Sequence, residues 1–189
     1  RSHEYYASGG WRGTWALDGG GALMNQGIHG VDLMLYVMGS VKNVSARMGT
    51  LARDIEVEDT ASAVLEFDNG AIGVIQASTC VYPGKQRRLE ICGDRGTIAM
   101  EGNTITCWDI EGEDSMNIPD SEVTMSETFK DPTLFSTEGH YRQIKNMVEA
   151  VLHNWRPLVD QYEGKKSVEL ILAIYDSAQQ DRVIYLEKG

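Results

Sequence analysis

The sequence has no excess of positive charge. Its 17 lysines and arginines stand against 28 aspartates and glutamates, so that the formal net charge is −11. Nucleic acids need lysine and arginine for their phosphates, and anionic membrane surfaces attract basic segments. The composition therefore argues against nucleic acid and membrane as partners, and it is otherwise that of a soluble globular protein.

Long apolar runs are also missing. No stretch reaches the roughly 18 consecutive apolar residues that a transmembrane helix needs. No signal-peptide pattern is visible either. We therefore expect a cytoplasmic protein.

Cysteine is scarce. Cys80, Cys92 and Cys107 are odd in number, far apart and without a CxxC pair. This pattern argues against a zinc site and against a disulfide framework. We expect three buried free thiols.

A dinucleotide-binding fingerprint is absent as well. No GxGxxG lies between a strand and a helix, and no acidic residue follows at the distance that a ribose requires. The 189 residues are enough for one domain with a full core. We expect that domain to hold no dinucleotide by itself.

The most informative stretch is 18–39, which reads DGGGALMNQGIHGVDLMLYVMG. Its second part predicts a helix, and the apolar side chains cover most of the circumference, which is typical of a buried helix. The glycines at 19–21 let the backbone approach another group closely or take a positive φ, and Asp18 is a candidate cap. Gly39 is a good residue to end the helix.

One narrow polar stripe interrupts this apolar surface. At α-helical spacing Asn25, His29, Asp32 and Tyr36 fall within about 60° of one another. Burying an amide, an imidazole and a carboxylate together is costly unless they pair or face a wet cleft. A lone buried histidine is usually a core residue whose hydrogen bonds are all made within the protein. The stripe therefore fits two interpretations, a polar cluster in the core and a functional site.

The same stretch resembles a known family signature. WRGTW at 11–15, followed by 19–39, looks like the substrate-domain signature of the Gfo/Idh/MocA oxidoreductases (glucose–fructose oxidoreductase, inositol dehydrogenase and relatives). Their pattern is GGG, a few residues, Asp or Asn, three residues, His, two residues and Asp, and Asn25 takes the Asp/Asn position. A second match, in the family's order, comprises PLVD at 157–160, EG at 163–164 and AIYDSA at 173–178.

The resemblance implies an α+β fold: a large, mostly antiparallel, open-faced sheet with helices packed on one face. The residues agree, because the pattern from Val41 to about Ile118 has period two and is rich in β-formers. The predicted strands are 44–51, 59–67, 71–79, 86–92, 97–101, 104–110 and a short 183–186. Asp68-Asn69-Gly70 predicts a hairpin turn, and helices are expected at 138–154 and 163–180.

Three further segments carry expectations. Residues 1–6 resemble the tail of a family strand. The acidic run 101–127 has no lysine or arginine, which predicts a solvated excursion from the sheet. The 12-residue EF-hand spacing is missing, which argues against a calcium site there. In the last helix we expect an inward face of Val168, Ile171, Leu172, Tyr175 and Ala178.

The resemblance also implies roles for residues of the stripe. His29 would be the acid/base, because histidine titrates near neutrality, and Asn25 would bind the reacting or neighbouring hydroxyl. Asp32 would orient the imidazole, contact substrate or hold a buried hydrogen bond. His140 is a minor substrate-binding candidate.

Several aromatic and guanidinium groups lie in the segment just before the glycines. Tyr5, Tyr6, Trp11 and Arg12 are candidates for substrate binding, through stacking on a sugar face or an Arg–carboxylate fork. For Trp11 and Trp15, packing under the helix fits equally well.

Taken together, residues 1–189 are expected to be the C-terminal substrate-binding and oligomerisation domain of an NAD(P)-dependent oxidoreductase. The substrate would be a sugar, sugar derivative or cyclitol, and the reaction would take place at one of its hydroxyls. The Rossmann domain that binds NAD or NADP, with its Glu-Lys-Pro lysine, would lie outside this chain, which alone would be inactive. We expect a homodimer or tetramer through the open sheet face, and no metal.

Two other classes stay open. One is a non-catalytic binding or assembly module that kept the fold. The other is a metal-dependent sugar isomerase or hydrolase that uses His29 and Asp32. The second needs further ligands, for which the sequence offers only His3, His140, His153 and scattered acids.

Overall fold

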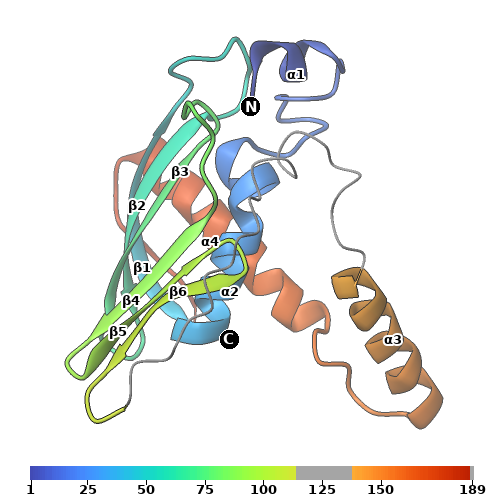
Figure 1. The fold of residues 1–189 in the computed structure, drawn as a ribbon. Coiled ribbons are helices and arrows are strands. Elements are labelled where there is room, and N and C mark those ends of the chain that lie inside the picture. The colour runs from blue at the N-terminus through green and yellow to red at the C-terminus, as the bar shows by residue number, and fades with distance from the viewer. Residues whose placement is uncertain (114–137, 188–189) are drawn as a thin grey trace. The chain divides into compact units, whose positions relative to one another are not determined.

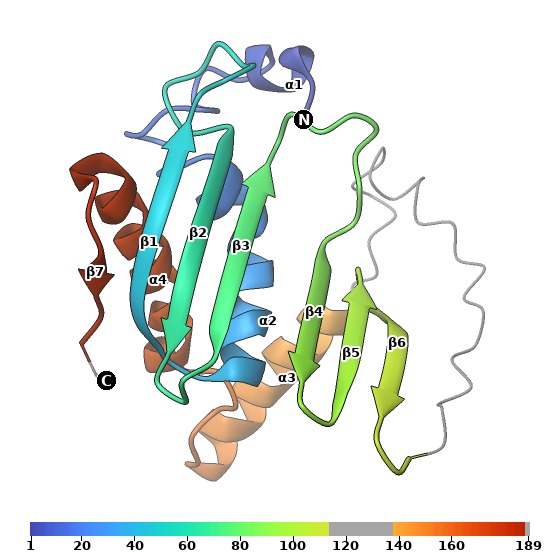
Figure 2. The ribbon, with the colours of Figure 1, turned by 90° about the vertical axis from the view of Figure 1, so that its left-hand side faces the viewer.

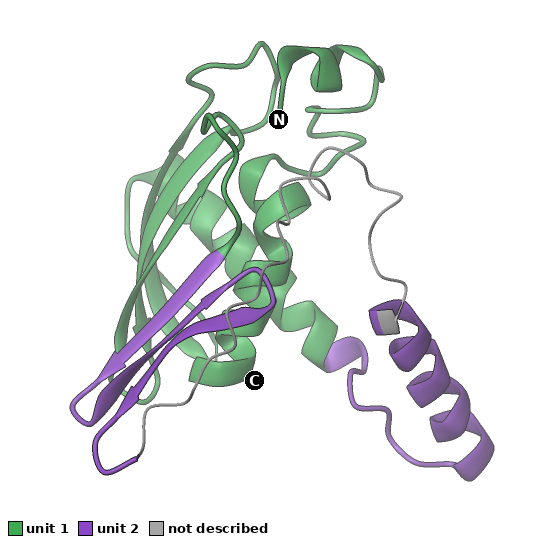
Figure 3. Cartoon of the chain, in the orientation of Figure 1, with its two compact units in different colours: residues 1–87, 163–189 green, residues 88–162 purple. Residues whose placement is uncertain are grey.

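The computed structural model describes residues 1–113 and 138–187. The chain divides into two compact units, residues 1–87 with 163–189 and residues 88–162 (Figure 3). We call them the first and the second unit. Within the described ranges, no helix combines the length and the apolar content needed to cross a membrane.

A four-stranded antiparallel sheet organises the first unit, with strand order β3-β2-β1-β7 (Figure 2). Its strands are β1 (Val41–Gly49), β2 (Thr60–Phe67), β3 (Ile72–Ser78) and β7 (Ile184–Tyr185). The predicted Asn-Gly turn joins β2 to β3: Gly70 has φ 87°, and the Phe67 N–H donates to the Ala71 carbonyl at 2.9 Å. This part of the prediction is confirmed.

Helices cover one face of that sheet. The first unit contains α1 (His3–Ala7), the π-helix η1 (Ala22–Gly27), α2 (Ile28–Met38) and most of α4 (Gln161–Gln180) (Figure 1). In Figure 2, α2 and α4 lie behind β1, β2 and β3. The core of this unit is formed by Leu23, Val31, Val44, Leu65, Phe67, Ile171 and Ile174, all at most 3% exposed.

The second unit holds a three-stranded antiparallel sheet and one helix. The strands β4 (Arg88–Gly93), β5 (Gly96–Glu101) and β6 (Thr104–Ile110) follow one another in space as in sequence. The helix is α3 (Glu138–His153), whose apolar stripe is largely exposed, as Ile144 (65%) and Val151 (74%) show. Beyond residue 113, the predicted acidic excursion lies outside the described residues.

The predicted α+β class is confirmed, and most element boundaries agree within a few residues. The strands, however, form two hydrogen-bonded sheets rather than one. Residues 1–6 were expected to end a strand, but Ser2 instead caps α1, its Oγ accepting from the Tyr5 N–H at 3.2 Å. A side-chain cap of this kind satisfies a helix N–H locally, which stabilises the short helix.

Two predictions about burial are wrong. In α4 Ile171 and Tyr175 are buried as predicted, but Val168 and Leu172 are 36% and 48% exposed and Ser167 is only 3% exposed, so the inward face is rotated from the predicted one. Two buried serines lie on this face: Ser167 donates to Asp32 of α2 at 2.8 Å, and Ser177 accepts the N–H of Ala46 in β1 at 3.0 Å. The three cysteines are free, but Cys92 is exposed and the other two are only partly covered.

Candidate functional site

The glycine triplet permits a close approach of two backbones. A Cβ added at Gly21 would lie 1.8 Å from the carbonyl oxygen of Glu58, so no other residue fits there without a shift. The next residue, Ala22, donates its N–H to the same carbonyl at 2.9 Å. The predicted role of the triplet is confirmed, and it anchors the start of η1.

The buried carboxylate of Glu58 caps that start. It is 2% exposed and accepts the N–H groups of Gly21 and Leu23, both at 2.9 Å, and the hydroxyl of Tyr175 at 2.8 Å. Burial, and then the nearby carboxylate, raise the pKa of Tyr175. A negative group suits the free N–H groups at a helix start.

From the sequence, Asp18 was expected to cap the helix. That expectation is wrong, because Glu58 is the cap. Asp18 Oδ2 instead accepts the N–H of Gly13 at 2.9 Å, and its Oδ1 accepts from the side-chain amide of Asn25. Glu58 was missed because it lies 35 residues from Leu23 in the sequence. Its position in an acidic loop carried no signal of burial.

Asn25 lies in a π-helical turn that the sequence did not predict. The segment η1 covers Ala22–Gly27, and α-helical geometry begins at Ile28. The α-helical angle assumed between Asn25 and His29 therefore does not apply. Single π turns inside helices are rare and occur frequently at functional sites.

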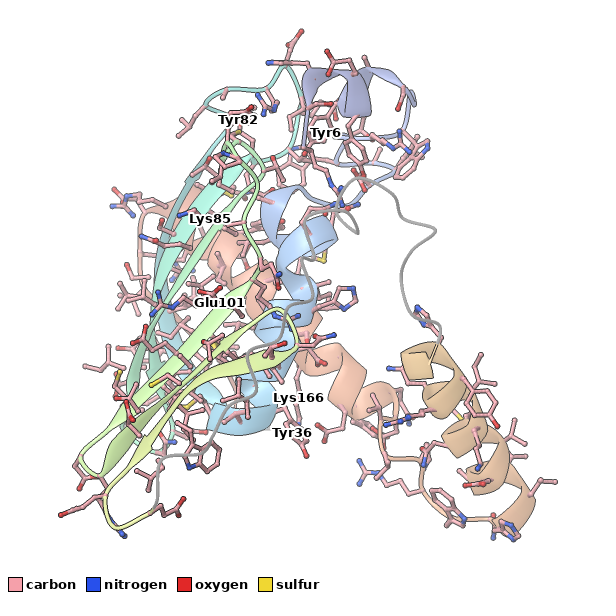
Figure 4. The ribbon with its side chains drawn as sticks, in the orientation of Figure 1. Tyr6, Tyr36, Tyr82, Lys85, Glu101 and Lys166 are labelled. Atoms are coloured by element: carbon pink, nitrogen blue, oxygen red, sulfur yellow. The ribbon has the colours of Figure 1, made fainter. Side chains whose placement is uncertain are left out.

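The α-helical part of the stripe faces outward. Val31 and Met34 are 3% and 7% exposed, whereas His29 and Asp32 are exposed and Tyr36 (Figure 4) is 87% exposed. The prediction of a buried helix is wrong, because Val31 and Met34 are the only buried residues of α2 in the described part of the chain. The polar stripe is thus not a cluster enclosed in the core.

Two stripe residues have defined partners. Asn25 is half-buried, donates through Nδ2 to Asp18 and accepts through Oδ1 from Gln26. Asp32 Oδ1 accepts the hydroxyl of the buried Ser167 at 2.8 Å, which ties α2 to α4. His29 lies in the first turn of α2, with its imidazole open to solvent.

The N-terminal aromatic residues form a compact cluster. The Tyr5 ring lies 4.9 Å from the Arg1 guanidinium and 4.5 Å from that of Arg12, and it meets the Tyr6 ring edge-on at 5.1 Å. Arg1 donates to Gln26 Oε1 at 2.7 and 3.1 Å. This pair links the cluster to η1, next to Asn25.

The remaining candidates lie around this cluster. Trp11 is 46% exposed, with its ring 5.2 Å from the Arg12 guanidinium. Trp15 is 40% exposed and packs edge-on against Tyr175 of α4 at 5.4 Å. A cleft of about 400 Å³ opens beside the cluster, lined among others by His3, Tyr6, Arg12, Arg53 and Glu56.

One predicted site residue belongs to the second unit: His140 is exposed in the first turn of α3. In the ranges that the structure describes, no three His, Cys, Asp or Glu side chains gather in a way that could hold a metal ion. All strand pairs in those ranges are antiparallel, so the parallel βαβ unit that cradles a dinucleotide is not among them.

Comparison with known proteins defines the class. The family described as GFO/IDH/MocA C-terminal domain matches residues 1–99, more than half of the chain. The protein therefore belongs to the Gfo/Idh/MocA C-terminal domain family.

Its relatives are dehydrogenases. It is 27% identical over 177 residues to myo-inositol 2-dehydrogenase of Thermotoga maritima, covering 89% of this chain and 50% of that protein. The WlbA dehydrogenase of Chromobacterium violaceum, crystallised with NADH and UDP-GlcNAcA, matches at 35% identity and a TM-score of 0.81, over 100% of this chain and 52% of that one. The Bordetella pertussis WlbA, crystallised with the same two molecules, matches at 34% identity and TM-score 0.81, over 100% and 54%. The chain thus spans about half the length of the relatives it matches.

Proposed function

We propose that this chain is the C-terminal, substrate-binding half of an NAD(P)-dependent oxidoreductase that acts on a hydroxyl of a sugar, sugar derivative or cyclitol. One observation carries the proposal: the solvent-open His29 follows directly on the π turn that holds Asn25. The dehydrogenases among its relatives support the reaction class. A companion Rossmann domain would hold the cofactor, which would supply a hydride acceptor.

The side chains of this half handle the hydroxyl and its proton. His29 takes the proton as the carbon is oxidised and returns it in the reverse direction, because an imidazole nitrogen can both accept and donate a proton. Asn25 cannot accept a proton, so it binds and orients the hydroxyl. Asp32 supports α2 through Ser167, and the Tyr5–Arg12 cluster lies at the edge of the site.

The order in which substrates are tested follows from the similarities. The two WlbA proteins were crystallised with UDP-GlcNAcA and resemble this chain over its whole length. UDP-linked uronic acids are therefore the first substrates to test, followed by free aldoses and inositols. The experiment is to combine each with NAD⁺ or NADP⁺ and the two-domain protein, and to follow NAD(P)H absorbance.

We also propose that the outer face of the four-stranded sheet joins two copies of the protein. Ser45, Val64 and Val74 lie side by side across β1, β2 and β3, and the two valines are 52% and 65% exposed. Ile72 in the neighbouring row is 77% exposed. An exposed apolar patch on a protein surface is typical of an interface.

The two alternative classes make different predictions. A non-catalytic module would bind a sugar or a partner copy without turning over any substrate in the presence of cofactor. A metal-dependent isomerase or hydrolase would contain a stoichiometric metal in elemental analysis. Turnover that depends on NAD(P)⁺ and is insensitive to chelators separates the oxidoreductase from both.

A further inference from the structure

We propose that Asp18 is a positioning residue that fixes the orientation of the Asn25 amide, through a directional row of hydrogen bonds formed by Arg1, Gln26, Asn25 and Asp18. The role of Asn25 itself rests on the proposed function. The row is observed directly. Arg1 donates to Gln26 Oε1, Gln26 Nε2 donates to Asn25 Oδ1, and Asn25 Nδ2 donates to Asp18 Oδ1.

The two ends of the row determine its direction. A guanidinium can only donate hydrogen bonds, and an ionised carboxylate can only accept them. Gln26 must therefore turn its oxygen to Arg1 and its NH₂ to Asn25. Asn25 must in turn direct its NH₂ to Asp18. Reversing either amide would set two donors or two acceptors against each other.

The carboxylate of Asp18 is itself held on the backbone. Its second oxygen accepts the N–H of Gly13 at 2.9 Å, and the Gly13 carbonyl accepts the N–H groups of Glu56 at 2.9 Å and Val57 at 3.3 Å. Asp18 therefore transmits the position of the 56–58 loop to Asn25. The same loop supplies Glu58, which caps η1.

A fixed amide gives the substrate a defined pattern of hydrogen-bonding groups. After its two bonds in the row, Asn25 retains one N–H and one oxygen lone pair. A sugar hydroxyl both donates and accepts, so it would bind this pair in one orientation only. A freely flipping amide would offer the two groups in either order and would hold the hydroxyl less well.

The test is a swap of donor and acceptor in the two-domain protein. Asn25→Asp alone places two carboxylates in contact. Asp18→Asn alone leaves one acceptor oxygen for two donors, the Gly13 N–H and the Asn25 amide, so its NH₂ must face one of them. The double variant Asp18→Asn/Asn25→Asp again pairs one donor with one acceptor, and Gln26 still donates to position 25. Asp94→Asn, in an exposed turn of the second unit, is the matched control.

We expect each single variant to lower the melting temperature and the double variant to recover most of that loss. For Asp18→Asn we expect KM for the sugar to rise about tenfold, the worth of one hydrogen bond to a charged group, with a smaller change in kcat. The KM for the nicotinamide cofactor should be unchanged, which a general loss of folding would not produce. Asp94→Asn should change none of these values.

The outcomes separate the two proposals. Melting losses that simply add in the double variant overturn the pairing of Asp18 with Asn25, whatever the kinetics show. Normal KM and kcat in Asp18→Asn, together with a strong loss in Asn25→Ala, overturn the positioning role and leave the proposed function intact. Normal turnover in Asn25→Ala overturns the substrate role of Asn25, while the melting cycle still tests the row.

Discussion

Glu58 and Tyr175, both buried, are joined by a hydrogen bond of 2.8 Å from the tyrosine hydroxyl to the carboxylate. Glu58 precedes β2 and Tyr175 lies in α4, and the same carboxylate caps η1. Three elements distant in sequence therefore meet at the start of η1, the segment that contains Asn25. The candidate site rests on a buried polar contact rather than on apolar packing alone.

This contact predicts the effect of Glu58→Gln on stability. The amide NH₂ would face N–H and O–H donors in place of a carboxylate oxygen, and a buried charged acceptor contributes about 1.5–3 kcal/mol per hydrogen bond. We expect the free energy of unfolding to fall by about 2–4 kcal/mol, measured by urea denaturation. In the control variant Glu101→Gln, at an exposed glutamate, the free energy of unfolding should fall by less than about 0.5 kcal/mol. Equal effects in the two variants would contradict the assigned cap.

A second buried acid predicts how stability depends on pH. Asp59 accepts the N–H groups of Leu51, Ala52 and Arg53 at 2.7–3.0 Å. Burial raises the pKa of Asp59, but these bonds outweigh it and lower that pKa from 3.8 to about 2. A carboxyl with a lowered folded pKa contributes stability above its unfolded pKa and loses it as pH falls towards the folded one.

We therefore expect Asp59 to stabilise the fold fully above about pH 5, with a progressive loss between about pH 4 and 2. Asp59→Asn should lower the melting temperature at neutral pH and flatten its acid dependence in that window. Asp54→Asn, in the same loop, is the control. If the melting temperature of Asp59→Asn depended on acid pH as that of the unaltered protein does, the Asp59 carboxylate would not be the group that stabilises this loop.

The features predicted from the sequence are those decided by neighbouring residues. The turn at Asn69-Gly70 follows from the positive φ that glycine tolerates, and the end of α2 at Gly39 follows from the same property. The glycine triplet likewise indicated a close backbone approach. In each case the residue and its conformation are only a few positions apart.

The features missed depend on contacts between distant residues. The run 56–59 contains three acids and one valine, and nothing local indicates that Glu58 turns inward to η1 while Glu56 stays exposed. The π turn is equally invisible, because its residues suit an α-helix as well. The exposure of His29 depends on which side of α2 the sheet covers.

The cofactor assignment predicts a negative binding result for this chain. The described strands pair only antiparallel, and the sequence has no dinucleotide fingerprint. Calorimetry at millimolar NAD⁺ or NADH should therefore show no binding to residues 1–189. The two-domain protein is the positive control. Saturable binding to the chain alone would refute the division of labour between the two halves.

The outer sheet face predicts an effect of Val64→Arg on assembly. Val64 lies between Ser45 and Val74, so a guanidinium there would place a like-charged pair in an interface of two copies. We expect sedimentation to show a monomer at concentrations where the unaltered protein dimerises. Leu158→Arg, at a position 80% exposed in the second unit, should leave assembly unchanged. A monomeric unaltered protein at high concentration would overturn the interface.

The catalytic role of His29 predicts a separation of activity from stability. In the two-domain protein His29→Ala should lower kcat by roughly 10²–10⁴, the usual effect of removing a positioned acid/base. The melting temperature should barely move, because the imidazole is exposed on α2. A structural histidine would behave in the opposite way, since its removal leaves a cavity and stranded partners that cost a few kcal/mol. His153→Ala, at an exposed histidine ending α3, is the matched control and should change neither value. A His29→Ala protein that melts much earlier yet keeps near-normal turnover would exclude His29 as the acid/base.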